Sequence, residues 1–290
     1  MNRIALGTVQ FGLPYGIANR VGQVSISSAQ DMLRLARNWG VDTLDTAIAY
    51  GESEYCLGQI GVKQYRVITK LPAIPDDNCD IPAWVEQQVL ASLERLGIAS
   101  LYALLLHRPA QLLEAQGPAI FQALTNLKKS GRVKKIGVSV YSPAELDLLV
   151  EKYRLDIVQA PFNLLDRRLF TSGWLRRLQA ENVEVHTRST FLQGLLLMPL
   201  SEIPVEFLAW KDLWEEWSNW LQSNRRVSAL QACLAYPLSF SEVGRVVVGA
   251  DSSNQLVQLL HAAMSCELSA FPDIQCDDET LINPSNWARK

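Results

Sequence analysis

The sequence lacks the long apolar runs of a membrane protein or a secretory leader. Its first residues, MNRIALGTVQ, lead straight into a strand-like run instead of the long apolar stretch of a signal peptide. The most apolar later segment, FLQGLLLMPL at residues 191–200, is too short to cross a bilayer and contains Gly194 and Pro199. We therefore expect no membrane partner.

A strong charge of either sign and an ordered set of cysteines are also lacking. The net charge of −3 gives no general attraction to nucleic acid or to anionic membranes. Five cysteines form no CxxC pair and no Cys/His metal pattern, which fits reduced thiols in a cytoplasmic protein without a metal site. They are Cys56, Cys79, Cys233, Cys266 and Cys276.

The sequence does contain a regular alternation of short apolar runs and longer helical patterns. No G-x-G-x-x-G follows the first run, which disfavours a Rossmann fold, and nearly all the runs are too apolar for a sheet with one face in water. Eight such units in 290 residues predict an α/β protein with a single-domain (β/α)8 TIM barrel. The runs cover residues 3–9, 41–47, 65–71, 101–108, 133–140, 155–162, 183–190 and 244–250.

Two segments fall outside this repeat within the single domain of residues 1–290. A Trp-rich helical insert at about 205–222 spaces Trp210, Trp214 and Trp217 at helical intervals. Such a stripe is typical of a packed helix face, and a lid over the barrel mouth is the alternative. The segment from about Asp273 is a polar C-terminal extension. We expect Ser27 or Ser28 to cap the first helix. We expect the sixth helix to run over about 169–181.

Four polar side chains end neighbouring apolar runs. Asp45 ends the second, Lys70 the third and His107 the fourth, while Tyr50 lies in the loop after Asp45. Each has an ordinary explanation alone, such as a turn cap, a solvated strand end or a hydrogen-bonded core histidine. Together they are expected at the carboxyl ends of adjacent barrel strands, where barrel enzymes place their chemistry.

This cluster suits proton transfer to a carbonyl oxygen. A phenol, whose usual pKa is about 10, is activated by a nearby ammonium that a carboxylate holds in place. A histidine can orient the carbonyl. Because no side chain donates a hydride, a nicotinamide cofactor is implied.

The four residues and the motifs around them resemble the aldo-keto reductase family over residues 4–265. The motifs are DTAIAYGESEYCLG, ITK and LLLHRP, with weaker matches in GTVQFG, GVSVYS, VQAPFNLLDRR, FLQGLL and VVVGADSSNQL. The resemblance implies that Tyr50 is the general acid, that Asp45 and Lys70 tune it, and that His107 positions the carbonyl.

The same resemblance implies an extended nicotinamide dinucleotide across the barrel mouth. Val140 stands where the family often has an asparagine that contacts the carboxamide. Arg188 takes the place of an aromatic residue that stacks on the nicotinamide; the alternative is that it pairs with a carboxylate while Phe191 fills the gap. Stacked, its charge would favour the reduced, neutral ring. Residues expected near this end of the cofactor are Gly7, Thr8, Asp45, Ser139, Gln159, Arg188 and Gly194.

The turn GADSSNQ at residues 249–255 resembles the family's binding turn for the adenosine phosphate. It places Gly249, Ala250, Asp251, Ser252 and Gln255 near the adenosine but lacks the arginine that many members have. A carboxylate there repels a 2′-phosphate and can accept a bond from a free 2′-hydroxyl. NADP(H) is expected from the resemblance, with NAD(H) as the alternative.

The sequence thus predicts an NAD(P)H-dependent oxidoreductase that reduces an aldehyde or ketone to the alcohol, or runs in reverse. Its partner is a small-molecule carbonyl or alcohol, and weak motif similarity points to a sugar-like one. A nucleotide-binding regulatory or partner subunit with little turnover is the alternative. The strand seven and eight loops lack a Gly-rich phosphate clamp, which disfavours a barrel isomerase or lyase. The oligomeric state is left open.

Overall fold

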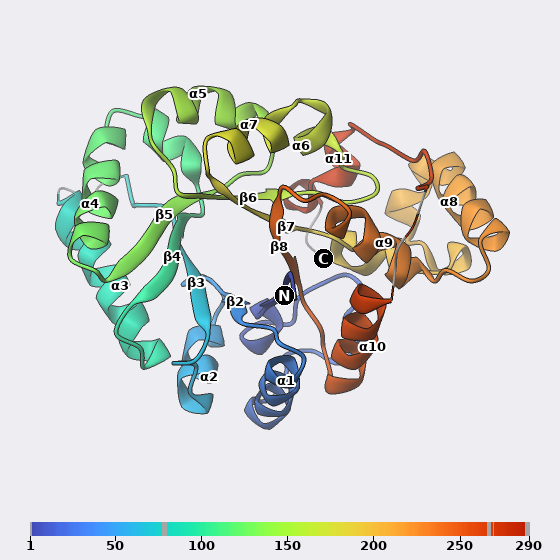
Figure 1. Cartoon of the computed structure of the whole chain (residues 1–290), viewed down its shortest axis with the longest axis horizontal. Helices are drawn as coiled ribbons and strands as arrows, with labels where there is room; N and C mark the ends of the chain where they lie inside the picture. The colour runs from blue at the N-terminus through green and yellow to red at the C-terminus, as the bar shows by residue number, and fades with distance from the viewer. Residues whose placement is uncertain (1, 77–79, 266–267, 269, 288–290) are drawn as a thin grey trace.

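Eight parallel strands close into a barrel in strict chain order (Figure 1). The computed structural model describes residues 2–76, 80–265, 268 and 270–287, so Cys79 and Cys266 lie outside the described residues. The expected (β/α)8 fold class is confirmed. The strands are β1 (Ile4–Gly7), β2 (Thr43–Asp45), β3 (Arg66–Leu71), β4 (Leu101–Leu106), β5 (Val133–Ser139), β6 (Ile157–Pro161), β7 (Glu184–Arg188) and β8 (Val243–Val248).

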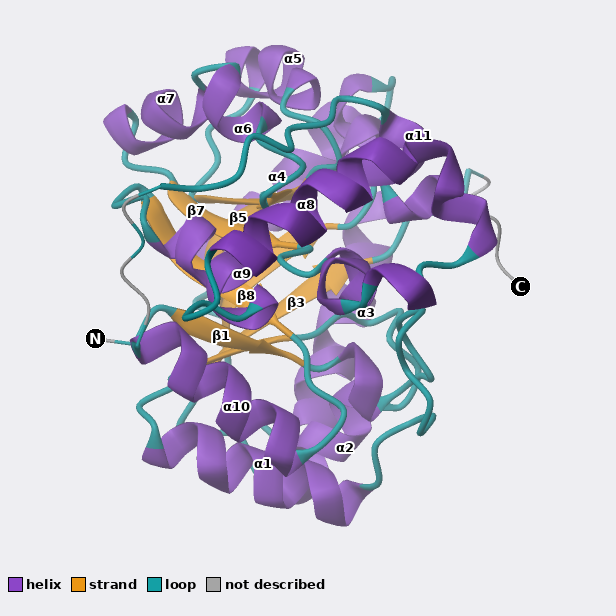
Figure 2. Cartoon of the chain, turned by 90° about the vertical axis from the view of Figure 1, so that its right-hand side faces the viewer, coloured by secondary structure: helices purple, strands orange, loops and turns teal. Residues whose placement is uncertain are grey.

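Helices cover the outside of this barrel, and Figure 2 shows the strands enclosed between them. They are α1 (Ile26–Asn38), α2 (Ser53–Ile60), α3 (Ile81–Leu96), α4 (Gly117–Lys129), α5 (Ala144–Lys152), α6 (Arg168–Thr171), α7 (Trp174–Ala180), α8 (Lys211–Ser223), α9 (Ala229–Leu238), α10 (Ser253–Met264) and α11 (Glu279–Ile282). Short 3-10 turns are η1 (Val9–Phe11), η2 (Pro109–Leu113), η3 (Leu192–Leu197), η4 (Leu200–Glu202), η5 (Val205–Trp210) and η6 (Pro284–Asn286). In the described part of the chain, no helix has the length and apolar character needed to cross a membrane.

Two helix predictions were wrong in detail. The cap of α1 is Ser25, whose side chain accepts a hydrogen bond from the Ser28 backbone, so the helix begins earlier than expected. The sixth helix is broken into α6 and α7 at Gly173, which has a φ of +80°. A left-handed residue ends one helix and redirects the chain into the next, and glycine adopts it without a side-chain clash.

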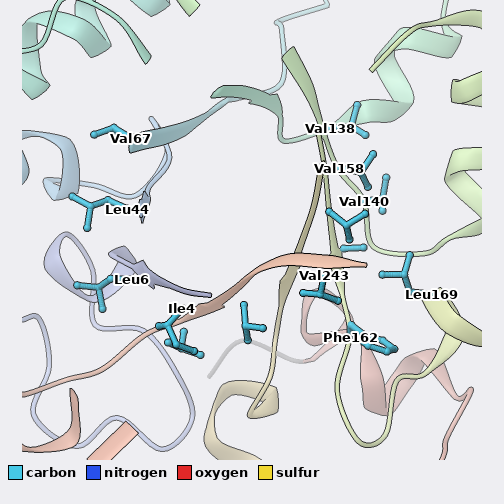
Figure 3. Packing of buried hydrophobic residues seen from close by; sticks show 14 of the residues in the cluster. Ile4, Leu6, Leu44, Val67, Val138, Val140, Val158, Phe162, Leu169 and Val243 are labelled. Carbon is cyan, nitrogen blue, oxygen red and sulfur yellow. The ribbon is translucent and has the colours of Figure 1, made fainter. Parts of the chain in front are cut away.

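The strands alternate between two apolar layers. Outward side chains such as Val67 and Leu104 join the large core between barrel and helices, part of which Figure 3 shows. Inward side chains form a small separate cluster that includes Ile68, Leu105 and Ile157. Because strand side chains alternate with period two, the residues two positions further on also face inward. That rule places three polar side chains above the inner cluster.

The Trp-rich insert packs as a helix face. Trp214 and Trp217 of α8 are 2% and 4% exposed and donate their indole N–H to the backbone oxygens of Phe207 and Leu196, at 2.8 and 3.1 Å. Helix α8 lies outside the ring of barrel helices, on the right of Figure 1. The packed-face interpretation accounts for these contacts.

The segment after Asp273 folds back onto the barrel. Its side chains Ile274, Leu281 and Ile282 are buried in the main core. The indole of Trp210 donates to Asp278 at 3.2 Å, which ties the insert to this tail. The extension is polar in composition, yet it contributes to the packed interior.

Candidate active site

The period-two alternation of the strands brings the polar strand ends together. Lys70 lies two residues beyond Ile68, Gln159 two beyond Ile157, and His107 two beyond Leu105, and each of the earlier residues is in the inner cluster. Strands β3 and β4 pair Lys70 with Leu105, and the His107 backbone N–H donates to the Leu71 oxygen at 3.0 Å. The carboxyl ends of the strands therefore carry these side chains to one rim.

Tyr50 reaches the same rim through a tight loop. After β2 the backbone follows β3, with the Ile48 N–H donating to the Lys70 oxygen at 3.2 Å, and then turns at Tyr50. Gly12 of the β1 loop packs so closely that a Cβ there would lie 1.8 Å from the Tyr50 oxygen. Glycine at position 12 thus allows the two loops to meet and fixes where the phenol stands.

A buried ion pair is the centre of the site. The Lys70 Nζ lies 2.5 Å from Asp45 Oδ1 and 2.9 Å from the Thr46 oxygen. Lys70 is 1% exposed and Asp45 is 3% exposed. Burial by itself lowers the pKa of Lys70, but Asp45 and Tyr50 attract the ammonium and outweigh it, so the pKa lies above its usual value. The lysine stays charged, because its partners replace the lost hydration.

Asp45 is held from its other side by a chain of amide and hydroxyl groups. Gln159 Nε2 donates to Asp45 Oδ2 at 2.6 Å, and Ser139 Oγ donates to Gln159 Oε1 at 3.4 Å. Both carboxylate oxygens are therefore occupied. The sequence placed Ser139 and Gln159 only at the cofactor, and their link to Asp45 was missed because it joins strands far apart in the chain.

The proton-bearing rings lie over this pair. The Lys70 Nζ is 5.0 Å from the Tyr50 ring centroid. The Tyr50 and His107 rings meet edge to face, with centroids 6.0 Å apart and an angle of 76°. Burial first, then the charges of Lys70 and Arg188, lower the pKa of His107 to about 4. A neutral imidazole near pH 7 can donate one hydrogen bond to a carbonyl oxygen without bringing charge.

Two further tyrosines belong to this rim and were missed from the sequence. Burial raises the pKa of Tyr15, as do Tyr50 and Tyr141, while Arg188 and Lys70 lower it. Tyr15, in the loop after β1, is thus within electrostatic reach of Tyr50 and Lys70, two members of the tetrad formed by Asp45, Tyr50, Lys70 and His107. Tyr141, two residues after β5, is within reach of Tyr15. Their positions in loops after strands were the available signal.

Arg188, the last residue of β7, is fixed at the same rim. Its Nη2 donates to the Val140 oxygen at 2.9 Å and its Nη1 to Ser189 Oγ at 3.2 Å. The guanidinium lies 4.6 Å from the centroid of the Tyr141 ring. Among the described residues no carboxylate forms an ion pair with it. In the described part of the chain, Arg188 thus has no carboxylate partner, and Phe191 is partly buried against the main core.

Three of the residues expected near the nicotinamide, Gly7, Thr8 and Gly194, lie where loops or strands meet. Gly7 ends β1 beside Asp45 in the register of the sheet. Thr8 is fully buried, with its hydroxyl 2.9 Å from Ser53 Oγ, so it braces the tetrad loop. Gly194 has a φ of +96°, and a Cβ there would lie 2.5 Å from the Ala18 side chain, so it marks where the β7 and β1 loops meet.

Side chains of the turn expected at the adenosine end form hydrogen bonds with some of its own backbone N–H groups. The Asp251 N–H donates to Gln255 Oε1 at 2.8 Å, and Ser252 caps α10 by accepting from the Gln255 N–H at 3.2 Å. The side chain of Asn19 donates to Asp251 Oδ1 at 3.4 Å. Burial raises the pKa of Asp251, and a hydrogen bond from Gln10 opposes the rise.

Gln10 is a further residue of this turn that the sequence did not indicate. A Cβ at Gly249 would lie 2.4 Å from the Gln10 Nε2, so the amide packs directly against the backbone of this turn. The Gln10 Oε1 is buried and has no hydrogen-bond partner among the described residues. This buried, unpaired acceptor can accept a hydrogen bond from a ligand hydroxyl or amino group.

Comparisons with known proteins identify the family of the chain. A family model described as "Aldo/keto reductase family" matches residues 3–271. Oxidoreductase sirO of Leptosphaeria maculans is 28% identical over 204 residues, covering 67% of this chain and 61% of that protein. The NADH-specific methylglyoxal reductase of Escherichia coli (strain K12) is 26% identical over 227 residues, covering 68% of this chain and 65% of that protein. The chain spans less than two thirds of either relative's length.

The fold is also similar to a solved structure. Aldo-keto reductase AKR11C1 from Bacillus halodurans, in its holo form, superposes with a TM-score of 0.74 at 20% identity. The superposition covers 92% of this chain and 88% of that one. At this identity the likeness concerns the barrel alone.

Proposed function

Because the chain belongs to the aldo/keto reductase family, we propose that it reduces an aldehyde or ketone to the alcohol, or catalyses the reverse, with Tyr50 as the proton donor. The observation that carries the proposal is the buried Lys70–Asp45 pair directly beneath Tyr50 and next to a neutral His107. A bound nicotinamide supplies or accepts the hydride in this scheme. The protein residues handle the proton and the carbonyl oxygen.

Each member of the tetrad has one task. Lys70 stays protonated beside the phenol, and a fixed positive charge stabilises the phenolate that forms when Tyr50 gives up its proton. Asp45 keeps that lysine charged and in place, while Gln159 keeps Asp45 oriented. His107 donates a hydrogen bond to the carbonyl oxygen and so presents it to Tyr50.

NADP(H) is the cofactor proposed from the family resemblance, with NAD(H) as the second candidate. Asp251 supports the second candidate, because its carboxylate lies at the turn where a 2′-phosphate would bind and would repel it. A relative from Escherichia coli is named as an NADH-specific methylglyoxal reductase, which also favours NAD(H) as a candidate. Dissociation constants for the two reduced nucleotides distinguish the candidates.

The proposed substrate is a small polar carbonyl compound, and the sugar-like class remains the one to test first. The phenols of Tyr15 and Tyr141 and the guanidinium of Arg188 border the tetrad, which favours a polar molecule over a long apolar aldehyde. Paired substrates of equal carbon number, such as glyceraldehyde and propanal, test this preference directly.

The decisive experiment replaces Tyr50 by phenylalanine. We expect kcat on a panel of aldehydes to fall by at least about 100-fold, the usual size of general acid catalysis, while nucleotide binding and the melting temperature stay unchanged. Tyr55→Phe is the matched control, since Tyr55 is 48% exposed on α2. Unchanged turnover in Tyr50→Phe refutes the proton donor.

Nucleotide binding is measured separately by quenching of the eight tryptophans. If neither NADPH nor NADH binds, the oxidoreductase proposal itself fails. Tight nucleotide binding without turnover of any substrate would support the regulatory-subunit alternative instead.

A further inference from the structure

We propose, building on the carbonyl reduction proposed above, that Arg188 leaves the site with one uncompensated positive charge and that this charge makes the protein bind the reduced cofactor more tightly than the oxidised one. Arg188 then sets which redox form of the cofactor the site prefers, and with it the favoured direction of the reaction. The residue acts through its charge rather than through a bond to the substrate.

Among the tetrad and Arg188, only the charge of Arg188 lacks a partner of opposite charge in the described part of the chain. Lys70 and Asp45 form a neutral pair, and both oxygens of Asp45 are already bonded. His107, with its pKa lowered to about 4, is uncharged near neutrality. Arg188 remains, because a guanidinium keeps its proton under all ordinary conditions. Its charge therefore has no counterpart among the described residues of the tetrad.

Nearby carboxylates are engaged elsewhere. Glu145 accepts the backbone N–H groups of Tyr141 and Ser142 at 2.6 and 2.8 Å, in the turn before α5. Asp166 binds the guanidinium of Arg168 at 2.9 Å. Neither forms an ion pair with Arg188. Among the described residues, no ion pair with a carboxylate therefore holds Arg188 at the rim.

The charge of Arg188 cannot move away easily. Two hydrogen bonds, to the Val140 oxygen and to Ser189, hold opposite ends of the guanidinium, and the Tyr141 ring lies against it at 4.6 Å. The side chain is half-buried at the end of a barrel strand. A charge held in this way acts like a fixed part of the scaffold and is screened less than a mobile surface lysine.

The charge of Arg188 lies at the same rim as the reacting groups. Arg188 binds the oxygen of Val140, and the Val140 N–H donates to the oxygen of Gln159, the residue that holds Asp45. The charge of Arg188 also contributes to the lowered pKa of His107. A nicotinamide that gives hydride to a carbonyl held by Tyr50 and His107 must stand within about 3.5 Å of that carbonyl carbon. The oxidised nicotinamide carries a positive charge and the reduced one does not. Arg188 therefore repels one redox form and leaves the other unaffected.

The experiment measures dissociation constants of NADPH and NADP+ by tryptophan quenching. We expect the wild-type protein to bind NADP+ at least tenfold more weakly than NADPH. In Arg188→Gln that ratio should fall by at least fivefold, mainly because NADP+ binds more tightly. Arg188→Lys, which keeps the charge, should retain a ratio close to wild type. Arg34→Gln, in an exposed pair with Asp31 on α1, is the matched control and should leave the ratio unchanged.

The outcomes separate this inference from the function on which it rests. Failure of both nucleotides to bind overturns the proposed function. Binding of both with a wild-type ratio near one, or a ratio unaltered in Arg188→Gln, overturns the role of Arg188 alone. A ratio in Arg188→Lys as low as in Arg188→Gln also overturns it, because the effect would then follow side-chain shape. The wild-type ratio provides a test even if Arg188→Gln fails to fold.

Discussion

Replacing Asp45 by asparagine tests the buried ion pair on which the site is built. The substitution keeps the shape of the side chain but leaves the Lys70 ammonium, 1% exposed, without its counter-ion. At 2.5 Å the direct attraction is about 7 kcal/mol for an effective dielectric constant of 20, most of which offsets the loss of hydration of both groups. Removing one partner of such a pair destabilises proteins by about 3–5 kcal/mol.

Urea unfolding followed by circular dichroism measures this loss. With a slope of about 3 kcal/mol per molar urea, the midpoint should fall by about 1 M or more. Asp31→Asn is the matched control, because Asp31 pairs with Arg34 at 3.0 Å on the exposed face of α1 and should contribute at most about 1 kcal/mol. Adding Lys70→Met to Asp45→Asn should restore part of the stability, since no unpaired ion then remains.

The pH dependence gives a second, independent signature. In the wild-type protein the pKa of Lys70 is raised, so its contribution to stability is present below the unfolded value of about 10.4 and is lost as the pH rises through the folded value. In Asp45→Asn burial acts without that counter-ion, and the lysine pKa falls below 10.4. The stability of the variant should therefore rise between neutral pH and about 10. A loss under 1 kcal/mol with no difference in alkaline slope would refute the buried pair.

Two further predictions concern the rim and the turn. In an NMR titration, His107 should stay neutral until the pH approaches 4. Because the folded pKa is depressed, the contribution of His107 to the free energy of unfolding is present above about pH 6.5 and is lost as the pH falls toward 4. This contribution amounts to at most about 3 kcal/mol. Protonation near pH 6.5 would show that the ring is not enclosed. Asp251→Asn should tighten NADPH binding about fivefold and leave NADH binding within twofold, as judged by tryptophan quenching. Equal effects on both nucleotides would mean that Asp251 does not face a 2′-phosphate.

The helix boundaries show where local sequence stops being sufficient. Three serines precede or begin α1, and each can cap a helix; the structure uses Ser25, because the Val24 N–H donates to the Gln10 oxygen and fixes the chain before it. The glycine at 173 was visible in the sequence, but its left-handed conformation depends on how α6 and α7 pack. Local helix propensity is only a weak preference, and packing decides which of the possible helix boundaries is used.

The sequence by itself determined the barrel and the identity of its main polar residues. Eight runs of period-two or continuous apolar character, separated by helical patterns, leave few other arrangements, and strand-end residues such as Asp45, Lys70 and His107 follow from that order.

Only the tertiary structure decided what each of these groups can do. Gln159 meets Asp45 across 114 residues of chain. Arg188 contacts Val140 and Tyr141 at the end of another strand, and no carboxylate among the described residues pairs with it. Protonation states and charge balance depend on burial and on partners within a few ångströms. Those distances are set when the barrel closes, and no local pattern in the sequence encodes them.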